Sequence, residues 1–216
     1  MSGRGPSLVI LAGGASMRLG ACKALARLRD APPNTPLALL LAAGRALDEL
    51  PPDPPLVVTG ADHLDILAAT PRGVEVAHNH AWRLGRTGSV LAARDARPGR
   101  DLCIAPVDVP LVPADVFLAL GEAWRAAGSP PRGWISPQTP DGRGGHPVVV
   151  GRELLSRWQP ASLDEPLRSL RQVASPSLIV VVATHSIHDN LDTPDDLKRL
   201  RGKAGPGLEG PPRRGR

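Results

Sequence analysis

A short glycine-rich segment with two cations follows the first apolar run of the chain, at residues 8–12. It reads Gly13-Gly14-Ala15-Ser16-Met17-Arg18-Leu19-Gly20-Ala21-Cys22-Lys23. Adjacent glycines allow a sharp turn whose N–H groups point at an anion, and Arg18 and Lys23 add positive charge. The segment therefore predicts a phosphate-binding loop. It is neither GxGxxG nor a Walker A loop, because Ala21 follows Gly20 instead of Lys-Ser/Thr. The structural alternative is a flexible turn with two solvated cations.

Short apolar runs alternate with helical patterns along the rest of the chain. Several runs are almost continuously apolar, which is typical of strands buried on both faces of a parallel sheet. The clearest helix start has Thr35 as N-cap and Pro36 as the first helical residue. The predicted strands are 8–12, 56–59, 74–77, 102–107, 134–136, 148–150 and 178–183. The predicted helices are 36–50, 62–69, 89–94, 114–127 and 194–200, the last capped by Thr193.

This alternation predicts an α/β fold built as a single-domain, doubly wound, mostly parallel sheet. Such sheets bind ligands outside the carboxyl ends of their strands, and the glycine-rich segment follows a predicted strand directly. We predict that residues 7–201 form the domain. The flanking residues 1–6 and the basic, Gly/Pro-rich tail 202–216 are predicted to be disordered, because their composition cannot form a packed core.

The composition argues against several classes of protein. The net charge of the 216 residues is +5, but residues 201–216 contribute +4 and Arg4 the rest, so residues 5–200 are neutral. With no Tyr and one Phe, nucleic-acid binding is not expected as the main function, and binding through the basic tail is the alternative. The longest apolar stretches, 37–43 and 178–183, are too short to cross a bilayer, and no signal peptide is evident. We expect a cytoplasmic protein without membrane contact.

The cysteines and histidines offer no further catalytic centre. Cys22 and Cys103 form no disulfide framework, which indicates a reducing compartment. Cys103 is expected in the core, and Cys22 has no neighbouring base that would make it a catalytic thiol. His78 and His80 flank Asn79 without an evident third metal ligand, so structural or solvent-exposed roles are expected. Trp82 and Trp134 are expected in the core or in a pocket wall.

Residues 11–23 resemble the signature LAxGxSxRMGxxK of the molybdenum-cofactor nucleotidyltransferase-like (MobA-like) NTP transferases, within the nucleoside-diphosphate-sugar pyrophosphorylase group. The strand, the glycines, Arg18 and Lys23 fall in register with that signature. Four later segments also resemble family motifs. They are Asn79–Ser89, whose part Gly85–Ser89 resembles the substrate- or base-facing G-x-x-S-S/L loop, Ala105–Pro110 (a GDMP-type turn), Gly142–Pro147 (GxxGHP) and Asn190–Leu197 (DIDTPEDL). The resemblance spans residues 8–197 and implies a Rossmann-like, GT-A-type nucleotidyltransferase fold.

The resemblance also implies roles for individual residues. Asp108 and Asp192 would hold Mg²⁺, although Asp108 could instead cap a turn and Asp192 could help to start the last helix, with Asn190 as a competing ligand. Arg18, Lys23 and Asp108 would be catalytic. The nucleotide-binding residues would be Leu11, Ala12, Gly13, Gly14, Ser16, Arg18, Lys23, Gly88 and Ser89. The substrate-binding residues would be Gly145, His146 and Pro147.

The implied activity is Mg²⁺-dependent transfer of NMP from an NTP to a small phosphorylated acceptor such as molybdopterin, with release of pyrophosphate. The spacing from Gly20 to Lys23 and the Gly-His-Pro segment resemble the cytidylyltransferase form and favour CTP. The Gly13-Gly14 pair is closer to the guanylyltransferase form, so GTP, a sugar phosphate or another NTP are alternatives. A catalytically inactive nucleotide-binding regulatory protein is the non-enzyme alternative. A monomer or a homodimer is expected, and residues 27–34 depart from the family pattern.

Overall fold

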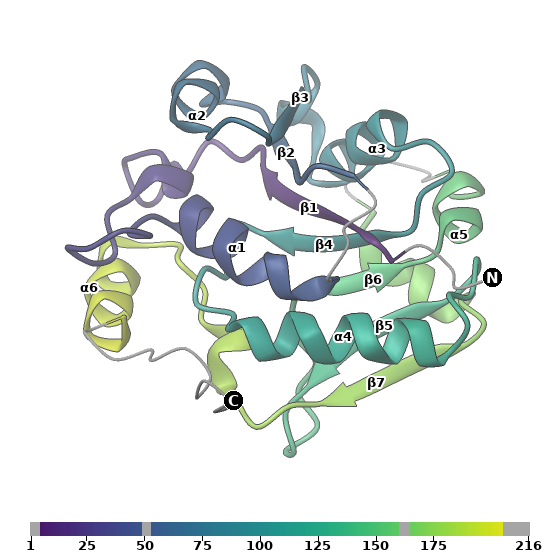
Figure 1. Ribbon diagram of the computed structural model, residues 1–216. Coiled ribbons are helices and arrows are strands. Elements are labelled where there is room, and N and C mark those ends of the chain that lie inside the picture. Colours follow the sequence, from purple (N-terminus) through teal and green to yellow (C-terminus); the bar gives the residue numbers. More distant parts are fainter. Residues whose placement is uncertain (1–4, 49–52, 160–164, 205–216) are drawn as a thin grey trace.

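A single seven-stranded sheet forms the centre of the computed structural model, which describes residues 5–48, 53–159 and 165–204 (Figure 1). The strand order is β3-β2-β1-β4-β6-β5-β7, and β6 alone runs antiparallel to its neighbours. The strands are β1 Ser7–Ala12, β2 Leu56–Thr59, β3 Glu75–His78, β4 Leu102–Pro106, β5 Trp134–Gln138, β6 Val148–Val150 and β7 Ser177–Val181. The predicted α/β class and the mostly parallel sheet are confirmed.

Six α-helices and five short 3₁₀ helices connect the described strands. The α-helices are α1 Pro36–Gly44, α2 His63–Ala69, α3 Thr87–Ala96, α4 Ala114–Ala126, α5 Arg152–Ser156 and α6 Pro194–Lys203. The 3₁₀ helices are η1 Lys23–Leu25, η2 Arg45–Leu47, η3 Trp82–Leu84, η4 Leu167–Gln172 and η5 His185–His188. The predicted caps are present, since the Thr35 and Thr193 side chains accept from the N–H groups of Ala38 and Asp196.

Some element boundaries differ from the predictions. The helix predicted at 36–50 ends at Gly44 and continues as η2, while residues 49–50 lie outside the described part of the chain. Helix α5 was not predicted, because five residues are too few to show a helical period. At the ends, Gly5 and Pro6 are buried, and residues 1–4 and 205–216 are outside the described residues. Helix α6 extends to Lys203, whose Nζ lies 2.7 Å from Asp189 Oδ1.

Alternate strand residues pack into two cores on opposite faces of the sheet. One face packs on α1, α2 and α4, through residues such as Ile10 and Phe117. The other face packs on α3, α5 and η4, through residues such as Val9 and Val90. A third, smaller apolar cluster joins Leu28 and Leu191 to Leu200 of α6. None of the described helices is long and apolar enough to cross a membrane.

A buried carboxylate at the amino end of β4 links that strand to two helices. Asp101, which is 6% exposed, directly precedes β4. It accepts from Trp124 Nε1 of α4 at 3.2 Å and from the Arg152 N–H at the start of α5 at 2.9 Å. The Arg152 guanidinium also lies 3.1 Å from it. One side chain therefore fixes α4 and α5, from opposite faces, to the same strand.

Candidate functional site

The loops that follow the central strands β1 and β4 bring the predicted charged residues together. Lys23 Nζ donates to Asp192 Oδ1 at 2.8 Å and lies 4.0 Å from Asp108 Oδ2. A terminal nitrogen of Arg18 lies 3.4 Å from the same Asp192 oxygen. The winding of the sheet reverses between β1 and β4, which is the position at which doubly wound sheets bind ligands. Arg18, Lys23, Asp108 and Asp192 therefore share one site.

Main-chain contacts hold three of these residues, Lys23, Asp108 and Asp192, in place. The Lys23 N–H donates to Ser16 Oγ at 3.1 Å, which closes the loop after β1. The Asp108 carbonyl oxygen accepts from the Leu191 N–H at 2.8 Å, so the segment before α6 lies against the turn after β4. The Asp192 N–H in turn donates to Asp196 Oδ2 at 3.1 Å, inside the capping box of α6. Asp192 is thus fixed by the helix cap and, through Leu191, by the turn after β4.

The charges of the site are balanced and partly shielded from water. The Lys23 side chain is 13% exposed, and those of Asp108 and Asp192 are 26% and 24% exposed. The hydrogen bond from Lys23, together with the charges of Lys23 and Arg18, holds the pKa of Asp192 below its usual value, although burial opposes this. Asp192 is therefore ionised at neutral pH. Two carboxylates beside two cations suit a ligand that combines a metal ion with phosphate groups.

The two adjacent glycines of the first loop differ in the space around them, and neither has the left-handed backbone of the turn. A Cβ on Gly13 would lie 2.6 Å from Ser89 Oγ, so the loop approaches the start of α3 because this residue has no side chain. Gly14 has open space where a Cβ would point. The left-handed backbone falls on Ser16 and Gly20, with φ of 51° and 75°. The sharp turn therefore lies after the glycine pair, and positive φ at a serine is a local strain typical of functional loops.

Asn79, the first residue of the segment that resembles the substrate- or base-facing loop, has a supporting role that the sequence did not indicate. It is 5% exposed, and its Nδ2 donates to Ser89 Oγ at 3.2 Å. Its Oδ1 accepts from the Ala81 N–H at 3.0 Å, which shapes the turn after β3. A Cβ on Gly88 would lie 3.1 Å from Asn79 Nδ2. Asn79 therefore positions Gly88 and Ser89 beside Gly13, and the signal for it was an asparagine directly after a predicted strand.

The predicted substrate-binding segment Gly145–Pro147 packs against η5. Its first residue has no room for a Cβ, which would lie 2.6 Å from the Ile187 carbonyl oxygen. His146 N–H donates to that oxygen at 3.3 Å. Burial lowers the pKa of His146, and the nearby Asp108 carboxylate opposes this effect. His146 Nδ1 is buried and has no hydrogen-bond partner among the described residues, which is uncommon for a buried polar atom.

Of the remaining candidate residues, Leu11 and Ala12 lie beside the charge cluster, whereas Asn190 contacts α6. Leu11 and Ala12 end β1, and the Leu11 carbonyl accepts from the Val107 N–H at 3.0 Å, next to the turn that carries Asp108. Asn190 is exposed, and its carbonyl oxygen accepts from Arg199 of α6 at 2.8 Å. Asn190 therefore contacts α6 through its main chain, while Asp192 contributes to the charge cluster.

His78 and His80 do have a third histidine beside them, although it is distant in sequence. The ring of His63, at the start of α2, stacks on His78 with 4.1 Å between ring centroids and 1° between planes. The His80 ring also lies 4.1 Å from His78, tilted by 51°. Stacked rings direct their nitrogens along parallel planes instead of toward one point. Within the described ranges, no group of three or more His, Cys, Asp or Glu residues is arranged to hold a metal ion.

The tryptophans and cysteines noted in the sequence contribute to packing. Trp134 is buried in the core, whereas Trp82 is half-buried with the Arg83 guanidinium 4.3 Å from its ring centroid. Cys22 is half-buried, and burial together with the Asp62 charge raises its pKa to about 11. Cys103 is fully buried, which raises its pKa further. Neither thiol forms a nucleophilic thiolate at neutral pH.

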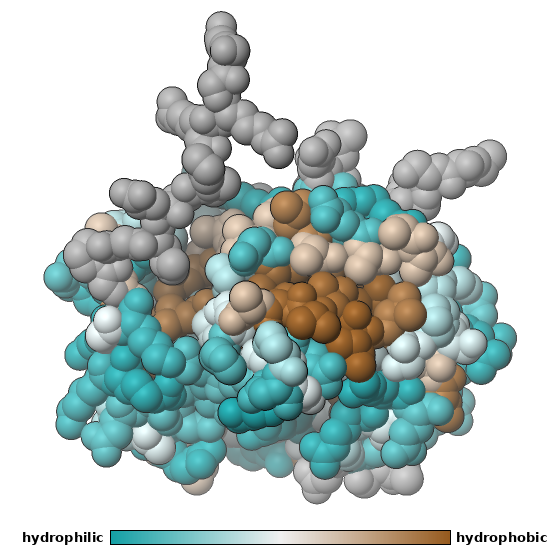
Figure 2. Space-filling model, turned by 90° about the horizontal axis from the view of Figure 1, so that it is seen from below, coloured by the Kyte–Doolittle hydropathy of each residue, from teal (hydrophilic) through white to brown (hydrophobic). Residues whose placement is uncertain are grey.

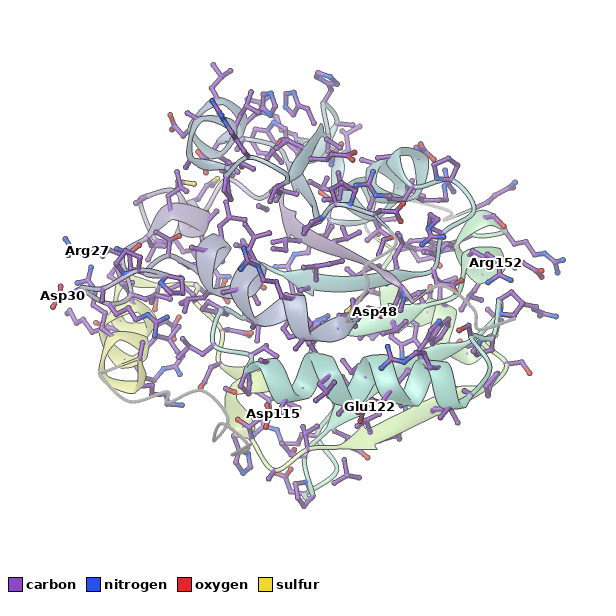
Figure 3. All side chains as sticks on the ribbon, viewed as in Figure 1. Arg27, Asp30, Asp48, Asp115, Glu122 and Arg152 are labelled. Atoms are coloured by element: carbon purple, nitrogen blue, oxygen red, sulfur yellow. The ribbon has the colours of Figure 1, made fainter. Side chains whose placement is uncertain are left out.

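The unusual segment at residues 27–34 forms part of the contact with α6. Leu28 is buried in the apolar cluster with Leu200, and the Arg27 carbonyl accepts from Arg201 Nε at 2.9 Å. Arg27 and Asp30 form an ion pair of 3.3 Å at the outer edge of the molecule, beside α6 (Figure 3). This segment therefore fixes the helix that follows Asp192.

Known proteins resemble this chain in sequence and in fold. A family model described as the MobA-like NTP transferase domain matches residues 8–190, which is most of the chain. No curated protein matches the chain.

Several solved structures share the fold. Rv0371c from Mycobacterium tuberculosis H37Rv has 22% sequence identity and a TM-score of 0.73, covering 92% of this chain and 98% of its own. The same protein in complex with manganese gives 19% identity and a TM-score of 0.68, with 92% and 98% covered. Molybdopterin-guanine dinucleotide biosynthesis protein A from Archaeoglobus fulgidus gives 18% identity and a TM-score of 0.64, with 91% and 97% covered. At these identities, the likeness establishes the fold.

Proposed function

Because the chain belongs to the MobA-like NTP transferase family and is a nucleotidyltransferase, we propose that it transfers NMP from CTP to a small phosphorylated acceptor, such as molybdopterin. A phosphate oxygen of the acceptor attacks the α-phosphorus of the NTP, the bond between the α- and β-phosphates breaks, and pyrophosphate leaves. The observation that carries this proposal is the convergence of Lys23, Arg18, Asp108 and Asp192 beyond β1 and β4.

Each residue of the cluster has a distinct task in this transfer. Lys23 neutralises the charge that grows around the α-phosphate, and Arg18, whose side chain is 68% exposed, reaches the β- and γ-phosphates. Gly13 and Gly14 present main-chain N–H groups to the triphosphate. No covalent intermediate on the protein is required, so the site acts by positioning the two substrates and by balancing their charge.

The residues present fit a magnesium ion. Two carboxylates, Asp108 and Asp192, approach the same Lys23 ammonium and are each about a quarter exposed, so both can reach a shared ligand. Mg²⁺ prefers oxygen ligands and is usually held by one or two protein carboxylates together with phosphates and water. When bound, the metal would withdraw charge from the phosphate oxygens. The manganese complex of Rv0371c is a precedent for a divalent ion in a protein of this fold.

The assignment of the base and of the acceptor rests on other residues. Ser89, which Asn79 holds beside Gly13, belongs to the loop that would face the base. His146, with a buried and unpaired Nδ1 near Asp108, would face the acceptor. CTP is favoured by the Gly20-to-Lys23 spacing and the Gly-His-Pro segment, whereas the Gly13-Gly14 pair favours GTP, so GTP is the second candidate.

Calorimetric titration tests the proposal. CTP, GTP, ATP and UTP are titrated into the protein with and without Mg²⁺, and the titrations are repeated with Asp108→Ala. We expect Mg²⁺-dependent binding of CTP that is lost in Asp108→Ala, followed by pyrophosphate release when molybdopterin is supplied. Asp115→Ala on α4 is the matched control, because it removes an exposed carboxylate outside the cluster (Figure 3).

The outcomes separate the parts of the proposal. Selective binding of GTP would replace CTP as the donor and leave the site assignment intact. A folded Asp108→Ala variant with wild-type activity would refute the metal assignment. Binding of an NTP without turnover on any phosphorylated acceptor would favour the inactive regulatory protein.

A further inference from the structure

Strand β7 is an edge strand with an apolar surface that no described element covers. It is the last strand of the sheet and lies at the lower edge in Figure 1. Its Leu178, Ile179 and Val181 are 36%, 43% and 66% exposed. Seen from that edge, the molecule presents a continuous apolar band bordered by hydrophilic residues (Figure 2). Isolated exposed apolar residues are ordinary, but a contiguous band along an unpaired strand is typical of an interface.

The backbone of β7 also offers unused hydrogen-bonding groups. Val182 N–H donates to Gln138 O of β5, and Pro176 O accepts from Trp134 N–H, both at 2.9 Å. In a parallel ladder, every second residue of a strand forms its backbone hydrogen bonds with the same neighbouring strand. The N–H and C=O groups of the even-numbered residues of β7 therefore point toward β5. The odd-numbered residues Ser177, Ile179 and Val181 therefore direct their N–H and C=O groups outward.

Charge does not protect this edge as it protects the opposite one. Residues 173–184 contain no Lys, Arg, Asp or Glu. At the other edge of the sheet, β3 is four residues long and carries Glu75, which is 53% exposed and pairs with Arg97 at 2.8 Å. Proteins usually block edge strands with charges, proline or short length. Residues 177–181 contain neither a charge nor a proline, which indicates that this edge is occupied.

We propose that the occupant is a second copy of this chain, paired antiparallel through β7 about a two-fold axis. Full overlap of the strand places Ile179 opposite the partner's Ile179, and Ser177 opposite the partner's Val181. Each of these pairs joins outward-facing residues, so every free N–H of one copy meets a free C=O of the other. The uncharged strand brings no like charges together, which makes the surface complementary to itself.

The small apolar area of β7 predicts a weak dimer. The exposed side chains of β7 offer about 200 Å² of apolar area per copy, well below the roughly 800 Å² per partner of a standard interface. Backbone pairing adds to this area without bringing it to that size. The dimer is therefore weak and depends on concentration, and it continues the sheet across two molecules. The nucleotide site lies at the ends of β1 and β4, in the middle of each sheet, and stays open.

Sedimentation velocity over about 1 μM to 1 mM tests this proposal, because that range detects complexes of micromolar to millimolar affinity. The full chain is expected to shift from monomer to dimer. Ile179→Lys and Ile179→Glu each place like charges opposite one another and are expected to weaken the dimer at least about tenfold. An equimolar mixture of the two variants places opposite charges there and is expected to restore the dimer. Leu64→Lys on α2, where the leucine is 75% exposed, is the control for an added charge and stays dimeric.

Three results would overturn the proposal. The first is a wild-type chain that stays monomeric up to about 1 mM, which would leave the edge to an extended peptide of another protein. The second is a dimer that persists in Ile179→Lys, which would place the interface elsewhere. The third is a mixture of the two charged variants that remains monomeric although each variant is folded by circular dichroism.

Discussion

Replacing Lys23 by alanine tests the charge cluster most directly. Lys23 Nζ lies 2.8 Å from Asp192 Oδ1 and 4.0 Å from Asp108 Oδ2, and its side chain is 13% exposed. A cation held in place before the reaction stabilises developing phosphate charge by about 3–4 kcal/mol. We therefore expect Lys23→Ala to lower kcat by about 10²–10³-fold. Measured pyrophosphate release with the nucleotide that binds in calorimetry gives this value.

The same substitution should leave the protein folded. Asp108 and Asp192 are about a quarter exposed, so water replaces the lost ammonium, and we expect a loss of about 1 kcal/mol of stability at neutral pH. Lys23 lowers the pKa of Asp192 in the folded state. A lowered folded pKa stabilises the protein above the unfolded pKa, and this contribution is lost as the pH falls through the folded pKa. The stability difference between wild type and variant should therefore shrink below about pH 4.

A matched control distinguishes a specific role from a general loss of charge. Lys198→Ala removes a lysine that is 76% exposed and pairs with Asp195 at 3.2 Å on the surface of α6. It should retain wild-type kcat, and Lys23→Gln should behave like Lys23→Ala. A folded Lys23→Ala variant that turns over at the wild-type rate would refute the reasoning, as would an equal loss of activity in Lys198→Ala.

Three further predictions concern stability and reactivity. Asp101→Ala should lower the free energy of unfolding by about 3 kcal/mol and Tm in calorimetry by roughly 6–12 °C, because it leaves buried donors such as Trp124 Nε1 without an acceptor. An unchanged Tm would show that the buried network contributes nothing to stability. Thr193→Ala should lower the free energy of unfolding, measured by urea denaturation, by about 1 kcal/mol, because the capping box with Asp196 is lost. A change near zero would contradict that role. Cys22, whose pKa is about 11, should react with iodoacetamide at pH 8 about 100-fold more slowly than a free cysteine. The rate of this reaction should rise about tenfold per pH unit. A fast reaction at pH 8 would exclude the raised pKa.

Local sequence patterns were enough to predict most of the fold. Buried strands such as β2 and β6 appear in the sequence as almost uninterrupted apolar runs, because both of their faces are covered. Thr35 and Thr193 marked helix starts, because a cap depends only on the next few residues. The sequence also predicted that the glycine-rich loop lies at the carboxyl edge of the sheet, since it directly follows the first parallel strand.

The tertiary structure decided how distant residues meet. Lys23 and Asp192 are separated by most of the chain, and only the pairing of β1 with β4 and the docking of the segment before α6 bring them to 2.8 Å. The contact of Asn79 with Ser89 and the stacking of His63 on His78 were not predicted for the same reason. Contacts of this kind depend on strand order, which local residue preferences do not encode.

The sequence by itself therefore determined the elements and the chemical types of residue in the loops between them. The tertiary structure decided which of those residues share one site, that the tight turn of the first loop lies at Ser16 and Gly20 instead of Gly13 and Gly14, and that β7 is an edge strand. The physical reason is that capping and burial periodicity act over a few residues. Charge clusters, close backbone approaches and free sheet edges arise only when strands far apart in the chain are placed side by side.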